Sequence, residues 1–153
     1  MDDRTLVLVD AGMAAGFRLA KPSLSQLHQA LVHLHAQHPE ALVAVLGDPA
    51  LKWDVATAEG PMFEGDIIAG AIVCAPAGAL EGTAGFLTRA AVKALAQGFT
   101  VVAFTDRAIP GVALGRLRNE GGRWLWDLDA TRTLDADQVG PPLTPSRRRR
   151  RSR

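Results

Sequence analysis

The stretch that decides the fold is residues 6–12, Leu-Val-Leu-Val-Asp-Ala-Gly. Its four consecutive apolar residues are typical of a strand buried on both faces, as the strands of a parallel sheet are. The acid and the two small residues that follow predict a turn where this strand ends. We therefore expect Asp10 at the carboxyl edge of a sheet.

Similar apolar runs recur along the chain and predict further strands at 41–46, 71–75 and 100–104. Helical patterns alternate with them. Ser23 and Gln26 have the spacing of a capping box, and leucines follow at helical spacing to about residue 37. Thr83 is predicted to cap a second amphipathic helix, which Gly98 ends. This alternation predicts an α/β domain with a central, mainly parallel sheet and helices on both faces.

Two stretches are harder to assign. In residues 50–69, Leu51, Trp53 and Val55 could form a short strand, followed by an irregular helix over 56–68. Near the C-terminus, the runs 112–117 and 123–128 predict a hairpin around a glycine-rich turn. Trp124 and Trp126 would share one face of its second strand, where they either pack in the core or stack on single-stranded bases.

The charges divide the chain into two parts. Residues 1–146 carry 11 basic and 16 acidic side chains, a net charge of −5, whereas six arginines lie in the last seven positions. Because the composition changes to proline and arginine near residue 138, we expect a folded domain over 1–138 and a disordered tail over 139–153. A basic tail could contact a polyanion, or it could simply be solvated.

The remaining totals exclude several classes of protein. Cys74 is the single cysteine, so no intramolecular disulfide is expected and a reducing compartment is the natural location. There is no signal peptide pattern and no run of 18 apolar residues, so we expect a cytoplasmic protein that does not enter a membrane. The glycine-rich segments lack the Lys-Ser/Thr of a phosphate loop, and no G-x-S-x-G elbow is present.

Acidic residues follow three of the four predicted core strands: Asp10, Asp48 and Asp106. Ligand sites of open parallel sheets lie beyond the carboxyl ends of the strands. Carboxylates that converge there repel one another unless a hard cation such as Mg²⁺ or Mn²⁺ lies between them. The sequence thus predicts a candidate metal site, although each aspartate could also serve only its local turn.

The order of these pieces resembles the PIN-like nuclease superfamily, in particular its regnase-like NYN branch. The resemblance covers about residues 5–110 and rests on five segments: Val9-Asp10-Ala11-Gly12-Met13, Lys21-Pro22-Ser23-Leu24, Gly47-Asp48-Pro49-Ala50-Leu51, Pro76-Ala77-Gly78 and Phe104-Thr105-Asp106-Arg107. It implies a three-layer PIN-like domain and a Mg²⁺- or Mn²⁺-dependent endoribonuclease. The family pattern has an Asn where Met13 stands and an acidic pair where Ala84-Gly85 stand.

Carried over residue by residue, the resemblance implies that Asp10 and Asp106 are metal-ligand acids, with Asp48 as a further acid. Glu81, the one carboxylate of its loop, would be a third ligand or a general base. RNA, expected to be single-stranded, would contact Arg107 and the tail arginines Arg147, Arg148, Arg149, Arg150 and Arg151.

Two other functions stay open at this point. The departures at Met13, Ala84 and Gly85 suggest a PIN-like module that binds RNA or a protein without cutting. If the resemblance is accidental, the domain could be a small-molecule binder or an accessory protein of a mobile element. A homo-oligomer is also open.

Overall fold

The computed structural model describes residues 4–76, 78 and 80–128. The expected domain boundary at residue 138 and the arginine tail lie outside these residues. Within the described part of the chain, no helix is both long and apolar enough to cross a membrane.

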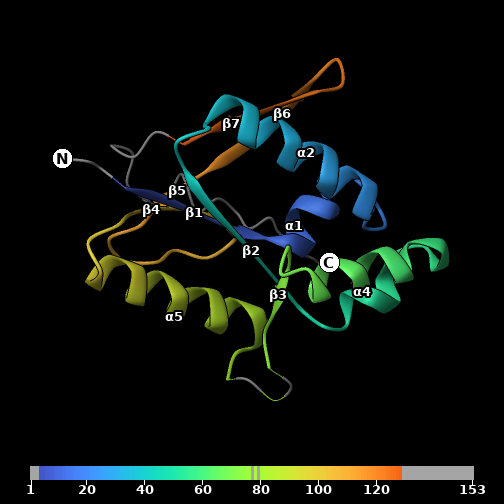
Figure 1. Cartoon of the computed structure of the whole chain (residues 1–153), viewed down its shortest axis with the longest axis horizontal. Helices are drawn as coiled ribbons and strands as arrows, with labels where there is room; N and C mark the ends of the chain where they lie inside the picture. Colours follow the sequence, from blue (N-terminus) through green and yellow to red (C-terminus); the bar gives the residue numbers. More distant parts are fainter. Residues whose placement is uncertain (1–3, 77, 79, 129–153) are drawn as a thin grey trace, which may run out of the picture.

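Five parallel strands form the central sheet, in the order β3-β2-β1-β4-β5 (Figure 1). They are β1 (Thr5–Asp10), β2 (Leu42–Gly47), β3 (Val73–Cys74), β4 (Thr100–Phe104) and β5 (Ala113–Leu114). The sequence prediction of an α/β fold with a parallel sheet is confirmed. The third strand is shorter than the predicted range 71–75, since only Val73 and Cys74 pair with β2.

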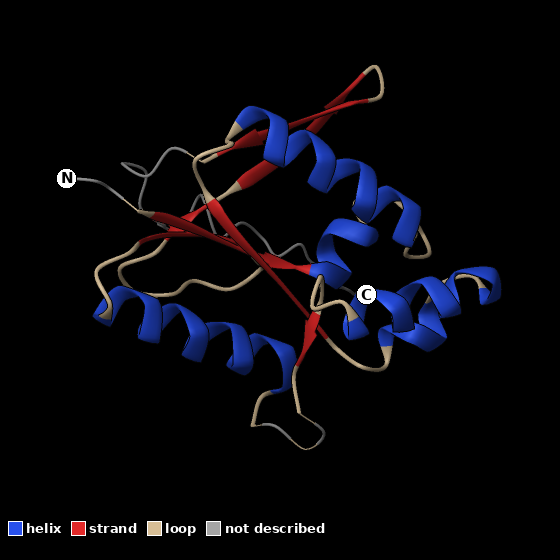
Figure 2. Cartoon of the chain, in the orientation of Figure 1, coloured by secondary structure: helices blue, strands red, loops and turns tan. Residues whose placement is uncertain are grey.

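Helices cover both faces of the sheet (Figure 2). On the central strand β1, Val7 and Val9 face a core that includes α1 (Ala11–Ala15) and α2 (Leu24–Gln37). Leu8 points to the opposite face and packs with α5 (Gly82–Ala96). This alternation explains why residues 6–9 are all apolar: each face of the strand is covered.

The α2 helix begins as its sequence predicts. Ser23 is the N-cap, and its hydroxyl accepts a hydrogen bond from the Gln26 N–H at 3.2 Å. The reciprocal half of the capping box is absent, because the Gln26 side chain instead donates to the carbonyls of Ala14, Ala15 and Phe17. Gln26 therefore holds the end of α1 against the start of α2.

The start of α5 differs from the prediction. Glu81, not Thr83, occupies the N-cap position, with a positive φ of 61° and no capping side-chain hydrogen bond. Gly82 also has a positive φ of 60°, so the chain turns into the helix before it reaches Thr83. Thr83 thus lies inside the first turn and cannot cap the helix. The predicted C-terminal end is confirmed, since α5 stops at Ala96, just before Gly98.

Residues 51–68 are helical rather than partly extended. They form α3 (Leu51–Asp54), a 3₁₀ turn η1 (Thr57–Glu59) and α4 (Gly60–Ile68). The interpretation of Leu51, Trp53 and Val55 as a strand was wrong: Leu51 and Val55 are buried, whereas Trp53 is 77% exposed.

The C-terminal hairpin consists of β6 (Arg116–Glu120) and β7 (Arg123–Asp127). The run 112–117 is not one strand, because residues 113–114 pair with the main sheet and the chain leaves it at Gly115. A Cβ on Gly115 would lie 3.3 Å from Val102, so glycine suits this crossing point. Trp124 and Trp126 share a face, as predicted, and both are buried at 5% exposure. Their role is core packing, not base stacking.

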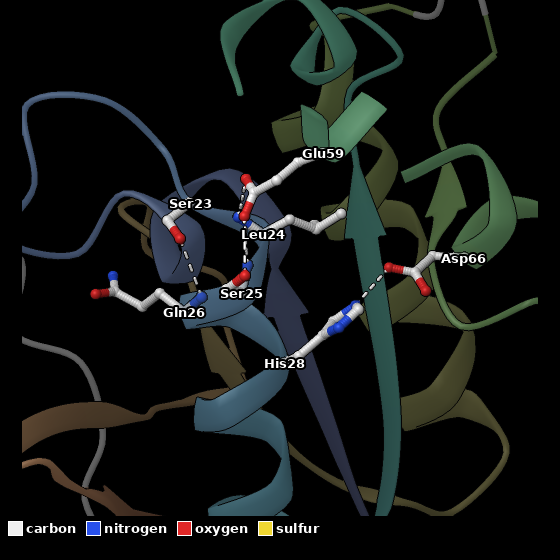
Figure 3. Close-up of polar contacts among 7 residues, drawn as sticks. All are labelled: Ser23, Leu24, Ser25, Gln26, His28, Glu59 and Asp66. Atoms are coloured by element: carbon white, nitrogen blue, oxygen red, sulfur yellow. Dashed lines mark hydrogen bonds and ion pairs between the residues drawn. The ribbon is translucent and has the colours of Figure 1, made fainter. Parts of the chain in front are cut away.

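Two polar contacts fix α2 to the segment that contains α4 (Figure 3). The Glu59 carboxylate accepts hydrogen bonds from the N–H groups of Leu24 at 2.8 Å and Ser25 at 3.0 Å. One turn further along α2, His28 Nε2 lies 2.6 Å from Asp66 Oδ2. These contacts hold α4 beside α2, at the end of the sheet where β1 and β2 finish.

Candidate functional site

The strand order places one edge of the sheet at a topological switch point. From β1 the chain builds outward through β2 to β3, and then returns to β4 on the other side of β1. In open α/β sheets, the crevice beyond the carboxyl ends of two such strands is the usual ligand site. Asp10 ends β1 and Asp106 follows β4, so two predicted acids flank this crevice.

Asp10 has a defined conformation because it is the N-cap of α1. Its Oδ1 atom accepts hydrogen bonds from the N–H groups of Gly12 at 3.0 Å and Met13 at 3.2 Å. Oδ2 receives no hydrogen bond from the described residues. The alternative prediction, that Asp10 serves its local turn, is therefore confirmed for Oδ1, while Oδ2 is available to a ligand.

The environment of Asp10 disfavours its charge. Burial raises the pKa of this carboxyl above its usual value of 3.8, and the neighbouring charges of Asp106 and Asp48 raise it further. The hydrogen bonds from Met13 and Gly12 lower the pKa but do not compensate. Asp106 and Asp48 are thus each close enough to repel the charge of Asp10, and a cation beside Asp10 would relieve that repulsion.

Asp48 and Asp106 are both exposed at this edge. Asp48 Oδ1 accepts a hydrogen bond from the Ala50 N–H at 2.8 Å, which is the local turn role expected before Pro49. Its charge also adds to the effect of burial in raising the pKa of the Cys74 thiol. Asp106 forms no hydrogen bond or ion pair with another described residue, so its carboxylate is free to bind a ligand.

A cavity of about 160 Å³ opens at this edge. We call it the rim cavity; its lining residues are Asp10, Gly12, Asp48, Ala50, Leu51, Asp54 and Thr83. The sequence did not single out Asp54, nor Thr83 as a site residue. Thr83 Oγ1 is a buried side-chain oxygen with no hydrogen-bond partner among the described residues. Asp54 ends the short helix α3, which follows β2, so an acid shortly after a strand end was the available signal for it.

Glu81 and Arg107 lie together, although the sequence assigned them different roles. Arg107 Nη1 donates to Glu81 Oε1 at 2.8 Å, and both side chains are about half exposed. This ion pair links the loop before α5 to the loop after β4. Glu81 does not line the rim cavity, so it would have to leave Arg107 to act as a metal ligand or base.

The departures from the family pattern have structural consequences. The Met13 side chain packs against the core below α1 and offers no oxygen to a cation. Gly85 is buried, and a Cβ there would lie 2.2 Å from the Leu80 carbonyl oxygen. An acidic side chain at position 85 would therefore require this loop to move, which excludes the family's acidic pair in the present backbone.

The acids at this edge do not make a complete, fully protein-bound metal site. Among the described residues, no three His, Cys, Asp or Glu side chains form a group that could hold a metal ion as they stand. Mg²⁺, however, commonly keeps several waters and uses only one or two carboxylates together with substrate phosphates. Asp10 and Asp48 line the rim cavity; Asp106 does not line it, but its charge reaches Asp10. Two of these acids could supply such a pair.

Arg147–Arg151, the predicted RNA contacts of the tail, lie outside the described residues. Comparison of the chain with protein-family models, curated proteins and solved structures found no match.

Proposed function

We propose that this chain is a metal-dependent endoribonuclease of the PIN-like, NYN type, which hydrolyses phosphodiester bonds of single-stranded RNA at the carboxyl edge of the sheet, around Asp10. The observation that carries the proposal is the state of Asp10: a half-buried carboxylate at the switch point of the sheet, with its pKa raised by burial and by two further acids. Perturbed carboxyl groups in a cleft are typical of active sites.

In this proposal Asp10 and Asp106 would hold a Mg²⁺ or Mn²⁺ ion, with Asp48 as an accessory acid. The N–H groups of Gly12 and Met13 keep the Asp10 carboxylate in one orientation, with Oδ2 directed to the ligand. The ion, when bound, would activate water and stabilise the charge that develops on the phosphate. Glu81 is the candidate general base once an RNA phosphate takes its place on Arg107.

Phosphate contacts give affinity without sequence choice and weaken as the salt concentration rises. Arg107 and Arg147–Arg151 are the proposed contacts of this kind. Because the single cysteine, Cys74, is a free thiol, a reducing compartment such as the cytoplasm suits the protein.

The second candidate is a PIN-like module that binds RNA or a protein without cutting. It is favoured by the lack, in the described part of the chain, of a ready group of three metal ligands, and by the pairing of Glu81 with Arg107. The two candidates differ in their dependence on metal.

The decisive experiment is cleavage of an end-labelled single-stranded RNA by the full chain with Mn²⁺. Asp10→Asn keeps an oxygen for the cap but removes the charge, so we expect it to abolish cleavage. Glu120→Gln, an exposed acid on the hairpin, is the matched control and should cut normally. RNA binding that a chelator does not affect, without cleavage above the Asp10→Asn background, would support the second candidate instead.

A further inference from the structure

A groove of about 390 Å³ lies beside the rim cavity, between α3 and the start of α4. The indole of Trp53 lines it, together with Val55, Gly60 and Pro61. Trp53 is 77% exposed, although burying an aromatic side chain is strongly favourable. We call this the Trp53 groove. Its open aromatic wall is a surface on which a flat group could stack.

The Trp53 groove already attracts one cation. Lys52 Nζ lies 5.0 Å from the centre of the Trp53 ring, and the same ammonium pairs with the Glu64 carboxylate. An aromatic ring combined with a carboxylate is a favourable environment for a positive charge. The chemistry of the groove therefore selects for cations.

The charge around the groove points the same way. Residues 48–66 contain five acids and one lysine. The carboxylate of Glu59 binds α2, that of Asp66 binds His28 and that of Glu64 pairs with Lys52. Asp48 and Asp54 are exposed. This excess of negative charge repels phosphate and is complementary to a basic segment. It disfavours stacking of an RNA base on Trp53.

We propose that the arginines at 147–151 of the same chain dock in the Trp53 groove. A guanidinium is planar, so it can stack on the indole and also pair with a carboxylate, which an ammonium does less well. The carboxylates in question are Glu64, where the arginine would replace Lys52, and the exposed Asp54, which follows Trp53 and lines the rim cavity. Eighteen residues separate Leu128 from Arg147, and such a segment can span up to about 60 Å. The described domain has an expected radius of gyration of only about 14 Å, so the groove is within reach.

This docking does not depend on the proposed nuclease activity. The groove and RNA would nevertheless compete for the tail, because both would bind the same arginines. RNA would release the tail from the groove, and the empty groove would leave Trp53 exposed again.

Acrylamide quenching of tryptophan fluorescence in the full chain tests the proposal, since Trp124 and Trp126 are buried and Trp53 is not. At about 50 mM salt, replacing Arg147–Arg151 by serine should raise the quenching constant roughly two-fold, because a single cation–π contact shifts an equilibrium by about that factor. Trp53→Phe should remove the accessible component in both backgrounds. Asp54→Asn with Glu64→Gln should reproduce the serine variant, whereas Glu120→Gln should not.

The difference should disappear in about 1 M NaCl, where the screening length falls to about 3 Å. A single-stranded RNA oligomer should raise quenching of the native chain to the level of the serine variant. Equal quenching of the two proteins at low salt would overturn the proposal. If the protection of Trp53 from quenching is lost when the protein is diluted tenfold, the groove binds the tail of a second copy of the chain. Quenching that falls when RNA is added would assign it to a nucleobase.

Discussion

Two regions of the molecule differ in how their buried polar groups are paired. The first is the contact between α2 and the hairpin, and the second is the carboxyl edge of the sheet. At the first, Trp126 Nε1 donates to the Ala30 carbonyl, and the Gln37 side chain bonds both the Trp126 N–H and the Trp124 carbonyl. At the second, burial and two neighbouring acids raise the pKa of Asp10, and Thr83 Oγ1 has no hydrogen-bond partner among the described residues.

The difference separates residues that stabilise the fold from residues that cost stability. Buried polar groups with partners fix one packing arrangement, whereas a buried carboxylate near two other acids lowers the stability of the folded state. Natural proteins accept such costs mainly at functional sites. The carboxyl edge, and not the hairpin, is therefore the region to test for function.

The largest expected effect on stability is at the contact between α2 and the hairpin. Trp126→Ala should lower the free energy of unfolding by about 3–5 kcal/mol, because it empties a packed site and removes the hydrogen bond from the indole to the Ala30 carbonyl. Trp126 also packs edge-on against Phe104, with ring centres 5.4 Å apart. Urea denaturation measures the loss, and Trp53→Ala is the matched control, expected within about 0.5 kcal/mol of the native chain. Similar losses in both variants would contradict the assignment of the hairpin to the core.

The elements that could be predicted from the sequence are those set by local patterns. The apolar run 6–9, the Ser23 cap and the pairing of Trp124 with Trp126 on one face all depend on neighbours a few residues away. The placement of Asp10 and Asp106 at one edge also followed, because parallel strands carry their ends to a common side.

The features that were missed depend on tertiary contacts or on positive backbone angles. Thr83 looked like a cap, but the left-handed conformations of Glu81 and Gly82 start the helix earlier. The pairing of Glu81 with Arg107 joins two loops 26 residues apart, which spacing alone does not encode. Trp53 looked like a strand residue because the pattern of residues 51–55 fits both a strand and a short helix.

A smaller effect on stability is expected at Asp10, where substitutions can separate the contribution of the helix cap from that of the negative charge. Asp10→Asn keeps the cap, so Asp10→Ala should be less stable than Asp10→Asn by about 0.5–2 kcal/mol. Because the folded pKa of Asp10 is raised, its charge destabilises the folded state only once the carboxyl ionises. The native chain should therefore lose stability relative to Asp10→Asn as the pH rises from 3.8 through the folded pKa, and the full difference should remain above it.

Urea denaturation between pH 3 and pH 8 measures this difference. Glu40→Gln, which changes an exposed acid in the turn before β2, serves as the control and should show no such trend. If the native chain instead becomes more stable than Asp10→Asn as the pH rises, the charge of Asp10 stabilises the folded state. That result would contradict the conclusion that the carboxyl edge costs stability.

The smallest effect is expected at Glu59, an acid in a favourable position. Burial raises the pKa of Glu59, but hydrogen bonds from the Leu24 and Ser25 N–H groups and the Ser25 hydroxyl more than compensate, so the folded pKa lies below its usual 4.5. A negative charge at a helix N-terminus contributes about 0.3–1 kcal/mol, and Glu59→Gln should lose about that much at pH 7. The loss should be complete above pH 4.5 and should vanish as the pH falls through the folded pKa, opposite in sign to Asp10. Glu40→Gln, which changes an exposed acid in the turn before β2, is the control. An unchanged stability of Glu59→Gln at pH 7 would show that the contact between α2 and Glu59 contributes nothing.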